Sequence, residues 1–281
     1  MVKNATTPDL RGKVIAITGG ARGIGLATAT RLTRLGATVA IGDIDEPRVK
    51  AAGEDLGLTV HSRLDVTDPR SFEDFLDRVE RELGPLDVLI NNAGIMPVGH
   101  LVDEPDEVTR RILDINVHGV IVGSRLAARR MAARRRGHVI NIASLAGETY
   151  LPGLATYSGS KAAVVGFTES ARRELRRSGV HFSAVLPTFT DTELSAGTPG
   201  TRGMRNAQPE DIAEAIAGLI DKPRPEVRVT RAAGVISASQ RFLPRRVNDV
   251  VFRLSGMYDA FTSKVDLEGR RAYEERARAA E

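Results

Sequence analysis

The sequence predicts an α/β protein in which helices cover both faces of a parallel sheet. Strand-like and helix-like segments alternate from residue 13 onward. The strand-like segments are short, nearly continuous apolar runs such as Val14–Ile17, which is typical of strands buried on both faces. No break in composition and no internal repeat divides the alternating region, so we expect one domain over residues 1–244 and a C-terminal extension over 245–281.

The individual elements follow from local patterns. Apolar residues, many of them β-branched, run together where we expect strands, at 14–17, 38–42, 59–64, 86–90, 138–143, 180–186 and, more weakly, 227–230. Apolar residues recur at helical spacing where we expect helices, at 24–35, 47–56, 69–79, 106–135, 155–177 and 209–219. The segment 193–208 is rich in Gly, Thr and Pro and has few large apolar residues, so we expect a mobile loop there.

Composition excludes several classes of protein. The 281 residues include no Cys, which excludes disulfides, zinc–thiolate sites and iron–sulfur clusters, and we predict no metal site. The 40 Lys and Arg residues are interspersed with 36 Asp and Glu residues, so we expect no nucleic-acid partner. No apolar stretch is long enough to span a membrane, and residues 1–11 lack the apolar core of a secretion signal. We therefore expect a cytoplasmic protein.

A glycine-rich turn follows the first predicted strand and opens the first predicted helix. The turn, Thr18–Gly25, contains Gly19, Gly23 and Gly25. Glycines there permit a tight turn and let the backbone approach a pyrophosphate at the positive end of the helix. Asp43 ends the second predicted strand, where a carboxylate can accept hydrogen bonds from an adenosine ribose and repel a 2′-phosphate. Together these features predict a dinucleotide site.

A second group of residues has the chemistry for proton transfer. Tyr157 and Lys161 are four residues apart, so they share one face of a predicted helix. An ammonium group near the phenol lowers the pKa of the phenol, which favours proton transfer near neutral pH. Ser144 follows a buried strand, at the edge where parallel sheets place reacting groups. Asn116 interrupts an apolar helical run, which indicates a polar role for its side chain.

Together these motifs resemble the short-chain dehydrogenase/reductase family in its common single-domain form. The stretches that carry the resemblance occur in the family's order and span about residues 11–235; they are Thr18–Gly25, Asp65–Val66, Asn91–Gly94, Asn116, Ser144, Tyr157 with Lys161, and Pro187. The resemblance implies a Rossmann-type doubly wound sheet of seven strands in the order 3-2-1-4-5-6-7. It also implies an oxidoreductase that transfers a hydride between a nicotinamide dinucleotide and a CH–OH group.

The resemblance implies a role for each matching residue. Tyr157 would be the general acid/base, and Lys161 would lower the pKa of Tyr157 and hold the nicotinamide ribose. Ser144 would hydrogen-bond the substrate oxygen, and Asn116 would hold a water that links Lys161 to bulk solvent. The other cofactor contacts would come from the glycine turn and from residues that follow the strands: Gly19, Arg22, Gly23, Ile24, Gly25, Asp43, Asp65, Val66, Asn92, Ala93, Gly94, Pro187, Thr190 and Thr192.

Two positions bear on the cofactor and its loop. Thr188 stands where the family usually has glycine, so the sequence does not fix the backbone path of the loop that follows Pro187. Thr192 keeps the hydroxyl that is expected to bind the carboxamide of the nicotinamide. Arg22 would attract a 2′-phosphate and Asp43 would repel one. Because Asp43 is expected to point at the ribose, we predict NAD rather than NADP.

The segments expected to line the substrate pocket are mostly apolar: Ile95–Pro97, Leu145–Gly147, Tyr150–Pro152 and Phe189. They carry no Arg or Lys placed to clamp a carboxylate, so we expect a lipophilic secondary alcohol or ketone of steroid, retinoid or fatty type. Two alternatives stay open. One is an NADPH-dependent carbonyl reductase, and the other is a non-catalytic dinucleotide-binding protein.

The C-terminal extension carries an apolar stripe at helical spacing: Val247, Val250, Val251, Leu254, Met257, Tyr258 and Phe261. We expect an amphipathic helix, bent at Gly256, that packs beside the substrate cleft or at a subunit interface. Its polar face mixes acidic and basic residues, which favours a protein contact over a membrane surface. The helices expected at 106–135 and 155–177 have apolar residues on more than one face, which predicts a homo-oligomer, and the resemblance points to a dimer or tetramer.

Overall fold

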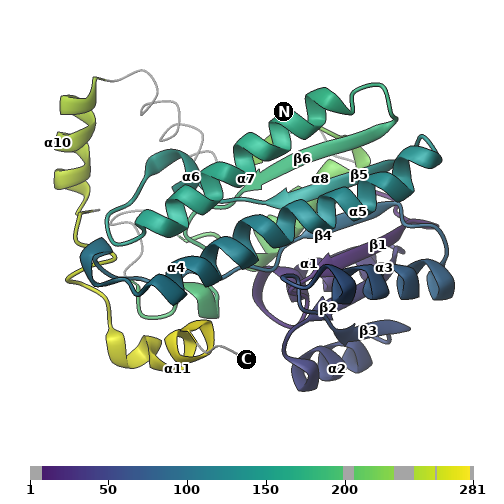
Figure 1. Ribbon diagram of the computed structural model, residues 1–281, viewed down its shortest axis with the longest axis horizontal. Coiled ribbons are helices and arrows are strands. Elements are labelled where there is room, and N and C mark those ends of the chain that lie inside the picture. The colour runs from purple at the N-terminus through teal and green to yellow at the C-terminus, as the bar shows by residue number, and fades with distance from the viewer. Residues whose placement is uncertain (1–7, 199–205, 231–243, 257, 279–281) are drawn as a thin grey trace, which may run out of the picture.

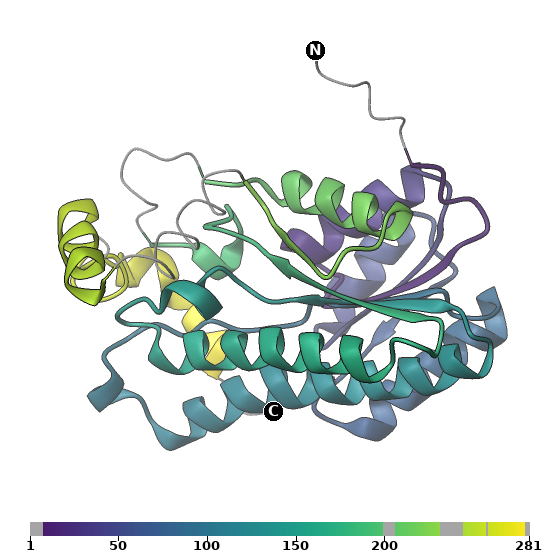
Figure 2. The same cartoon turned by 90° about the horizontal axis from the view of Figure 1, so that it is seen from above.

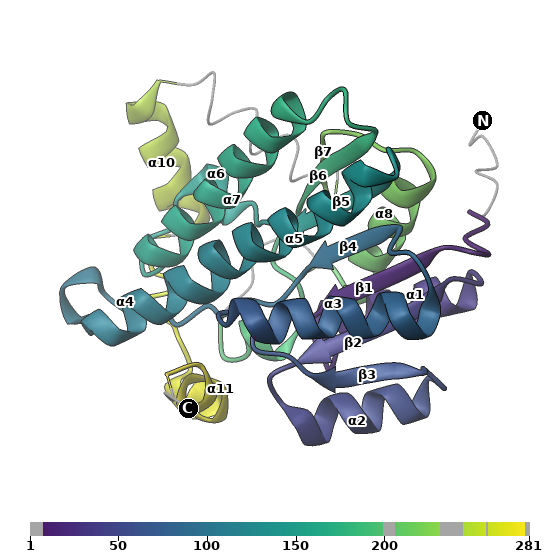
Figure 3. The same cartoon turned by 45° about the vertical axis from the view of Figure 1, so that its right-hand side comes forward.

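The structure is a computed structural model that describes residues 8–198, 206–230, 244–256 and 258–278. Within these residues, seven parallel strands form one sheet in the order β3-β2-β1-β4-β5-β6-β7 (Figure 3). The strands are β1 (Val14–Thr18), β2 (Thr38–Asp43), β3 (Val60–Arg63), β4 (Val88–Asn91), β5 (Gly137–Ile142), β6 (Val180–Leu186) and β7 (Glu226–Arg228). The predicted fold class and strand order are confirmed.

Helices alternate with the strands, as the sequence pattern predicts. They are α1 (Gly23–Arg34), α2 (Glu46–Asp55), α3 (Pro69–Leu83), α4 (Asp106–Leu113), α5 (Val120–Ala133), α6 (Ala146–Thr149), α7 (Ala155–Glu174), α8 (Pro209–Asp221), α10 (Arg245–Ser255) and α11 (Leu267–Arg278). Local sequence explains several of their ends. Asp68 caps α3 by accepting a hydrogen bond from the Arg70 backbone, and Pro69 supplies the first residue of this helix.

The helices cover both faces of the sheet, because alternate side chains of a strand point to opposite faces. Along β1, Ile15 and Ile17 belong to one apolar cluster with residues of α1, α2 and α8. Val14 and Ala16 belong to another cluster, with residues of α3, α5 and α7. Figure 2 shows α8 and α7 on opposite sides of the sheet. Because each central strand packs on two sides, its sequence is continuously apolar.

The helix expected over 106–135 is interrupted. A π-helical turn, Asp114–Gly119, separates α4 from α5. Such turns are rare and occur frequently at functional sites. Here the turn contains the buried Asn116, so the polar residue that stood out in the sequence marks the place where the helix changes its geometry.

The C-terminal extension forms two helices, α10 and α11, rather than one bent helix. Both helices lie beyond the edge of the sheet at which the strands end (Figure 1). Gly256 ends α10 in the left-handed conformation, with φ of 73°. Of the predicted stripe, Val247 and Val250 are exposed, and Phe261 is buried. Met257 and the side chains of Val251 and Leu254 lie outside the described residues. None of the helices in the described ranges is long and apolar enough to cross a bilayer.

Candidate active site

The glycine turn connects β1 to α1 and leaves no room for side chains at two of its glycines. A Cβ on Gly25 would lie 2.0 Å from the carbonyl oxygen of Gly19. A Cβ on Gly19 would lie 2.9 Å from the Cα atom of Ala93. Gly19 and Gly23 also have positive φ angles, 66° and 53°, which other residues rarely adopt. The turn therefore requires glycine for its own packing, and no side chains at these glycines separate its backbone from a ligand.

The segment after β4 fastens this turn in place. The Thr18 hydroxyl oxygen accepts hydrogen bonds from the backbone N–H groups of Asn92 and Ala93, both at 3.0 Å. The Asn92 amide donates to the carbonyl oxygens of Thr18 and Gly19, at 3.0 and 2.9 Å. Asn92 lines the cleft described below, and it also ties the glycine turn to β4.

The start of α1 is open toward a ligand. Its N-cap residue Arg22 makes no capping hydrogen bond through its side chain, and the first turn contains no acidic residue. The first N–H groups of a helix have no partners within the helix and attract anions. Thr192, on the loop after β6, faces Gly23, since a Cβ on Gly23 would lie 3.4 Å from the Thr192 methyl carbon. These two loops fit the pyrophosphate of a dinucleotide.

Carboxylates mark the expected adenosine end of the site. Asp43 is buried at the end of β2 and accepts hydrogen bonds from the backbone N–H groups of Ala21 and Asp45, both at 3.1 Å. Asp65 accepts hydrogen bonds from the backbone N–H and the hydroxyl of Thr67, at 2.8 and 2.7 Å. Each carboxylate has further lone pairs with which to accept hydrogen bonds from a ribose or an adenine.

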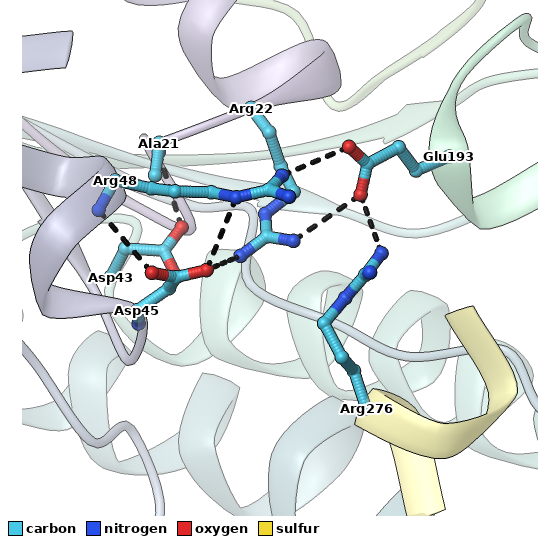
Figure 4. A network of polar contacts seen from close by, with 7 residues as sticks. All are labelled: Ala21, Arg22, Asp43, Asp45, Arg48, Glu193 and Arg276. Atoms are coloured by element: carbon cyan, nitrogen blue, oxygen red, sulfur yellow. Dashed lines mark hydrogen bonds and ion pairs between the residues drawn. The ribbon is translucent and has the colours of Figure 1, made fainter. Parts of the chain in front are cut away.

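A network of charged side chains lies along the cleft beside Asp43 (Figure 4). Arg22 donates to Asp45 at 2.5 Å and to Glu193 at 3.2 Å. Glu193 also accepts hydrogen bonds from Arg48 at 2.9 Å and from Arg276 of α11 at 2.6 Å. Arg22 is therefore paired with two carboxylates, which changes its expected role. A 2′-phosphate would have to compete with both of them for this guanidinium.

The proton-transfer residues meet at the other end of the cleft. Tyr157 and Lys161 lie in the first turns of α7 and are 6% and 4% exposed. The Lys161 Nζ atom is 5.8 Å from the centroid of the Tyr157 ring and donates a hydrogen bond to the carbonyl oxygen of Ile142 at 2.9 Å. Ser144 follows β5 and hydrogen-bonds the Tyr157 hydroxyl. The structure thus brings Ser144, Tyr157 and Lys161 together.

Asn116 lies behind this group rather than within it. Its Oδ1 atom accepts a hydrogen bond from the Ile95 backbone N–H at 2.9 Å. Its Nδ2 atom donates to the Ile95 carbonyl at 2.9 Å and to the Ser160 hydroxyl at 3.1 Å. A Cβ on Gly94 would lie 3.1 Å from Asn116 Oδ1 and 3.5 Å from Lys161 Nζ. Asn116 therefore holds the segment after β4 against α7, close to Lys161.

Burial dominates the ionisation of the proton-transfer pair. It raises the pKa of Tyr157 to about 12, although the hydrogen bond with Ser144 acts in the opposite direction. Burial also lowers the pKa of Lys161 to about 8. The sequence led us to expect a Tyr157 pKa lowered by Lys161, and this expectation is wrong for the protein without ligands. Desolvation of the two groups shifts their pKa values more than the attraction between the Lys161 ammonium and the Tyr157 phenolate does.

The site residues line one cleft of about 960 Å³, near the upper end of the usual range for small-molecule sites. All the predicted site residues line it except Gly25, which packs behind Gly19, and Asn116. Of the residues expected in the substrate pocket, six line the cleft and four do not: Ile95, Met96, Leu145, Ala146, Leu151 and Phe189 line it, whereas Pro97, Gly147, Tyr150 and Pro152 do not. Phe189 stacks on Phe261 at 5.3 Å between ring centroids. Tyr150 is 64% exposed and lies outside the cleft, contrary to expectation.

Comparison with known proteins assigns the family. Residues 13–202 match the family model described as short chain dehydrogenase. The chain belongs to this family of oxidoreductases.

The chain is also similar to curated proteins and to solved structures. The chain is 34% identical over 256 residues to "Probable oxidoreductase EphD" of Mycobacterium tuberculosis, covering 83% of the chain but only 43% of that relative's length. It is 39% identical over 220 residues to the cis-4-hydroxycyclohexanecarboxylate dehydrogenase of Sinomonas cyclohexanicum, covering 74% of the chain and 88% of the relative. The crystal structure of 3-ketoacyl-(acyl-carrier-protein) reductase from Brucella melitensis complexed with NADH superimposes with a TM-score of 0.72 at 25% identity, covering 78% and 97% of the two chains.

In this member of the family, α11 supplies cleft residues that the sequence analysis did not predict. Tyr273 and Arg276 line the cleft, and Arg270 of the same helix is completely buried. The segment has a polar sequence with opposite charges at four-residue spacing, which is typical of a solvated helix. Of the predicted apolar stripe, Phe261 lines the cleft, whereas Val247 and Val250 do not. The extension reaches the cleft mainly through a helix that had not been predicted.

Proposed function

We propose that the protein transfers a hydride between NAD(H) and a secondary alcohol or ketone. The observation that carries this proposal is one cleft with the glycine turn at one end and, at the other, Ser144 beside the buried Tyr157 and Lys161. NAD, when bound, supplies the hydride chemistry. The residues of the chain would orient the reactants and move the proton.

The roles that we propose follow from the contacts of each side chain. The Ser144 hydroxyl would hydrogen-bond the substrate oxygen. The Tyr157 phenol would accept the hydroxyl proton of an alcohol that is oxidised, or donate its proton to the oxygen of a ketone that is reduced. Lys161 in its charged form would offset part of the cost of the Tyr157 phenolate. Asn116 would keep the segment after β4 in place beside Lys161.

We propose NAD as the preferred cofactor. Asp43 and Asp45 place two carboxylates near the expected ribose, and Glu193 adds a third on the facing loop. Their charges disfavour a 2′-phosphate. The Brucella melitensis structure, complexed with NADH, supports the same choice. An NADPH-dependent carbonyl reductase is a second candidate, and Arg22 is the observation in its favour.

We propose a substrate with a largely apolar body. Met96, Leu151, Leu154 and Phe189 line the cleft and belong, with Tyr157, to one apolar cluster. Such walls favour a lipophilic secondary alcohol or ketone of steroid, retinoid or fatty type. The name of the Sinomonas cyclohexanicum relative, which specifies a ring alcohol, supports a CH–OH group on a carbon skeleton.

A screen of cofactors and alcohols tests this proposal. NAD+ and NADP+ reduction would be followed by absorbance with a panel of secondary alcohols, and the reverse reaction with the matching ketones. We expect turnover with at least one pair and a preference for NAD. Tight dinucleotide binding without turnover of any pair would favour the non-catalytic alternative instead.

We also propose that the protein is a homo-oligomer assembled through the region of α4, α5 and α7. Ile121 and Val165, on α5 and α7, are only half-buried in the single chain, which leaves apolar surface for a partner. Light scattering should give a dimer or tetramer. A species of 30.3 kDa at micromolar concentration would contradict this proposal.

A further inference from the structure

A buried arginine fastens α11 across the cleft. Arg270 is 0% exposed, and its guanidinium donates to the carbonyl oxygens of Leu194 and Ala196 at 2.8 and 2.9 Å. It also donates to the carbonyl oxygen of Met96, and its Nε atom pairs with Glu274 at 2.6 Å. One side chain thus joins α11 to the loop after β4 and to the loop after β6. The position of the helix is set by contacts on both sides of the cleft.

Tyr273, almost one turn further along α11, lines the same cleft as Tyr157. The Arg270 guanidinium lies 4.6 Å from the centroid of the Tyr273 ring. The Tyr273 hydroxyl oxygen accepts a hydrogen bond from the Met96 backbone N–H at 2.7 Å. Burial raises the pKa of Tyr273, and the nearby Tyr157 adds to this effect. The extension therefore brings a second, protonated phenol into the cleft that Tyr157 also lines.

The Tyr273 hydroxyl still has a proton to donate. Its oxygen is the acceptor in the bond with Met96, and within the described part of the chain it donates to no protein acceptor. Tyr273 is half-buried. A bound substrate would exclude water from its hydroxyl, and an unsatisfied donor is unfavourable away from water. The cleft is the side from which an acceptor can reach it.

We propose that Tyr273 donates a hydrogen bond to a second oxygen atom of the substrate, distinct from the oxygen that reacts at Tyr157. The inference deepens the proposed function and rests on it. The preferred substrate would then be an apolar skeleton with two oxygen functions, such as a hydroxy acid, a hydroxy ester or a hydroxyketone. Arg270 and Met96 fix the phenol before the substrate binds, so little ordering is needed when the hydrogen bond forms.

Matched alcohols with and without a second oxygen test this inference. One pair is cyclohexanol and 4-hydroxycyclohexanecarboxylate, and the other is 2-octanol and 3-hydroxyoctanoate. In the wild type we expect kcat/KM to be at least about tenfold higher for the oxygen-bearing member of one pair, since a site built to hydrogen-bond a substrate group rejects the analogue that lacks it. No such selectivity in either pair would overturn the inference.

The variant Tyr273→Phe removes the hydroxyl and keeps the ring over Arg270. We expect KM for the oxygen-bearing alcohol to rise about tenfold, while kcat and the constants for the simple alcohol change by less than about twofold. Tyr258→Phe is the matched control, because Tyr258 is on the extension but is 38% exposed and outside the cleft lining. It should leave all constants unchanged.

Three results separate the possible failures. If Tyr273→Phe raises KM equally for both members of a pair, or for neither, Tyr273 has only a structural role and the inference is wrong. If the wild type turns over no alcohol or ketone, the proposed function fails first. Hydrogen exchange over residues 267–278 shows whether the variant keeps α11 docked. If α11 detaches in the variant, the selectivity of the wild type for the oxygen-bearing alcohol still tests the inference.

Discussion

Glu193 and Arg22 meet across the cleft at 3.2 Å, although one follows β6 and the other precedes α1. Their side chains are 45% and 27% exposed, and pairs this exposed contribute only about 0–1 kcal/mol to stability. The contact therefore matters mainly because it changes the net charge of the cleft where a cofactor would bind. Asp43, Asp45 and Glu193 offset the positive charge of the arginines around them.

Replacing Asp43 should change the choice of cofactor. Asp43→Ser removes the carboxylate nearest the expected ribose and leaves Arg22 in place. We expect the ratio of kcat/KM for NADP to that for NAD to rise at least about tenfold, or 1.4 kcal/mol. Steady-state kinetics with both cofactors measure this ratio. An unchanged ratio, or a wild type that already prefers NADP, would contradict the assignment.

Replacing Glu193 should act in the same direction with a smaller effect. Glu193→Gln frees Arg22 and Arg48 from one carboxylate, so we expect kcat/KM for NADP to rise about threefold to tenfold while that for NAD changes little. Glu214→Gln is the matched control, because Glu214 pairs with Arg31 at 2.7 Å outside the cleft. Equal behaviour of the two variants would show that the contact with Arg22 has no part in cofactor choice.

Removing the buried arginine should release the C-terminal helix. Arg270→Met leaves three carbonyl groups without their donor, at a cost of about 1–3 kcal/mol for each group that stays buried. We expect α11 to detach rather than the whole protein to unfold, so amide exchange over residues 267–278 should rise at least about tenfold. Arg271→Met, at a neighbouring residue that is 77% exposed, should leave exchange unchanged. Slow exchange in the Arg270 variant would refute this account of docking.

Acid should destabilise the fold through a histidine. Burial lowers the pKa of His138 from 6.5 to about 3. Between these values the unfolded chain binds the proton and the folded chain does not, so the free energy of unfolding falls as the pH falls, by up to about 1.4 kcal/mol per pH unit. His138→Leu removes this component, so its stability relative to the wild type should improve from pH 7 to pH 4. Denaturant unfolding at several pH values measures the difference, and a constant difference would contradict the prediction.

The parts of the fold that could be predicted from the sequence have local causes. The continuous apolar run at β1 reflects burial on both faces, and the glycines at 19 and 25 reflect a turn without space for a Cβ. The four-residue spacing of Tyr157 and Lys161 is enough to place them on one face of α7.

The missed features depend on contacts between distant residues. The π-helical turn is tied to a hydrogen bond between Asn116 and Ile95, 21 residues apart in sequence. The docking of α11 depends on Arg270 and Met96, which are 174 residues apart. An arginine in a charged helical segment resembles a solvated residue until the carbonyl groups around it are known. The raised pKa of Tyr157 likewise depends on burial, which residue spacing does not reveal.

The turnover of Tyr157→Phe tests the central claim most directly. The phenylalanine keeps the ring in its buried place and removes only the group proposed to transfer the proton, a step that contributes about 10²–10⁴ to the rate. For the folded variant, with NAD affinity measured in parallel, the account predicts a loss of kcat of at least about a hundredfold and nearly unchanged cofactor binding. A variant that keeps more than about a tenth of the wild-type kcat would show that Tyr157 is not the general acid/base.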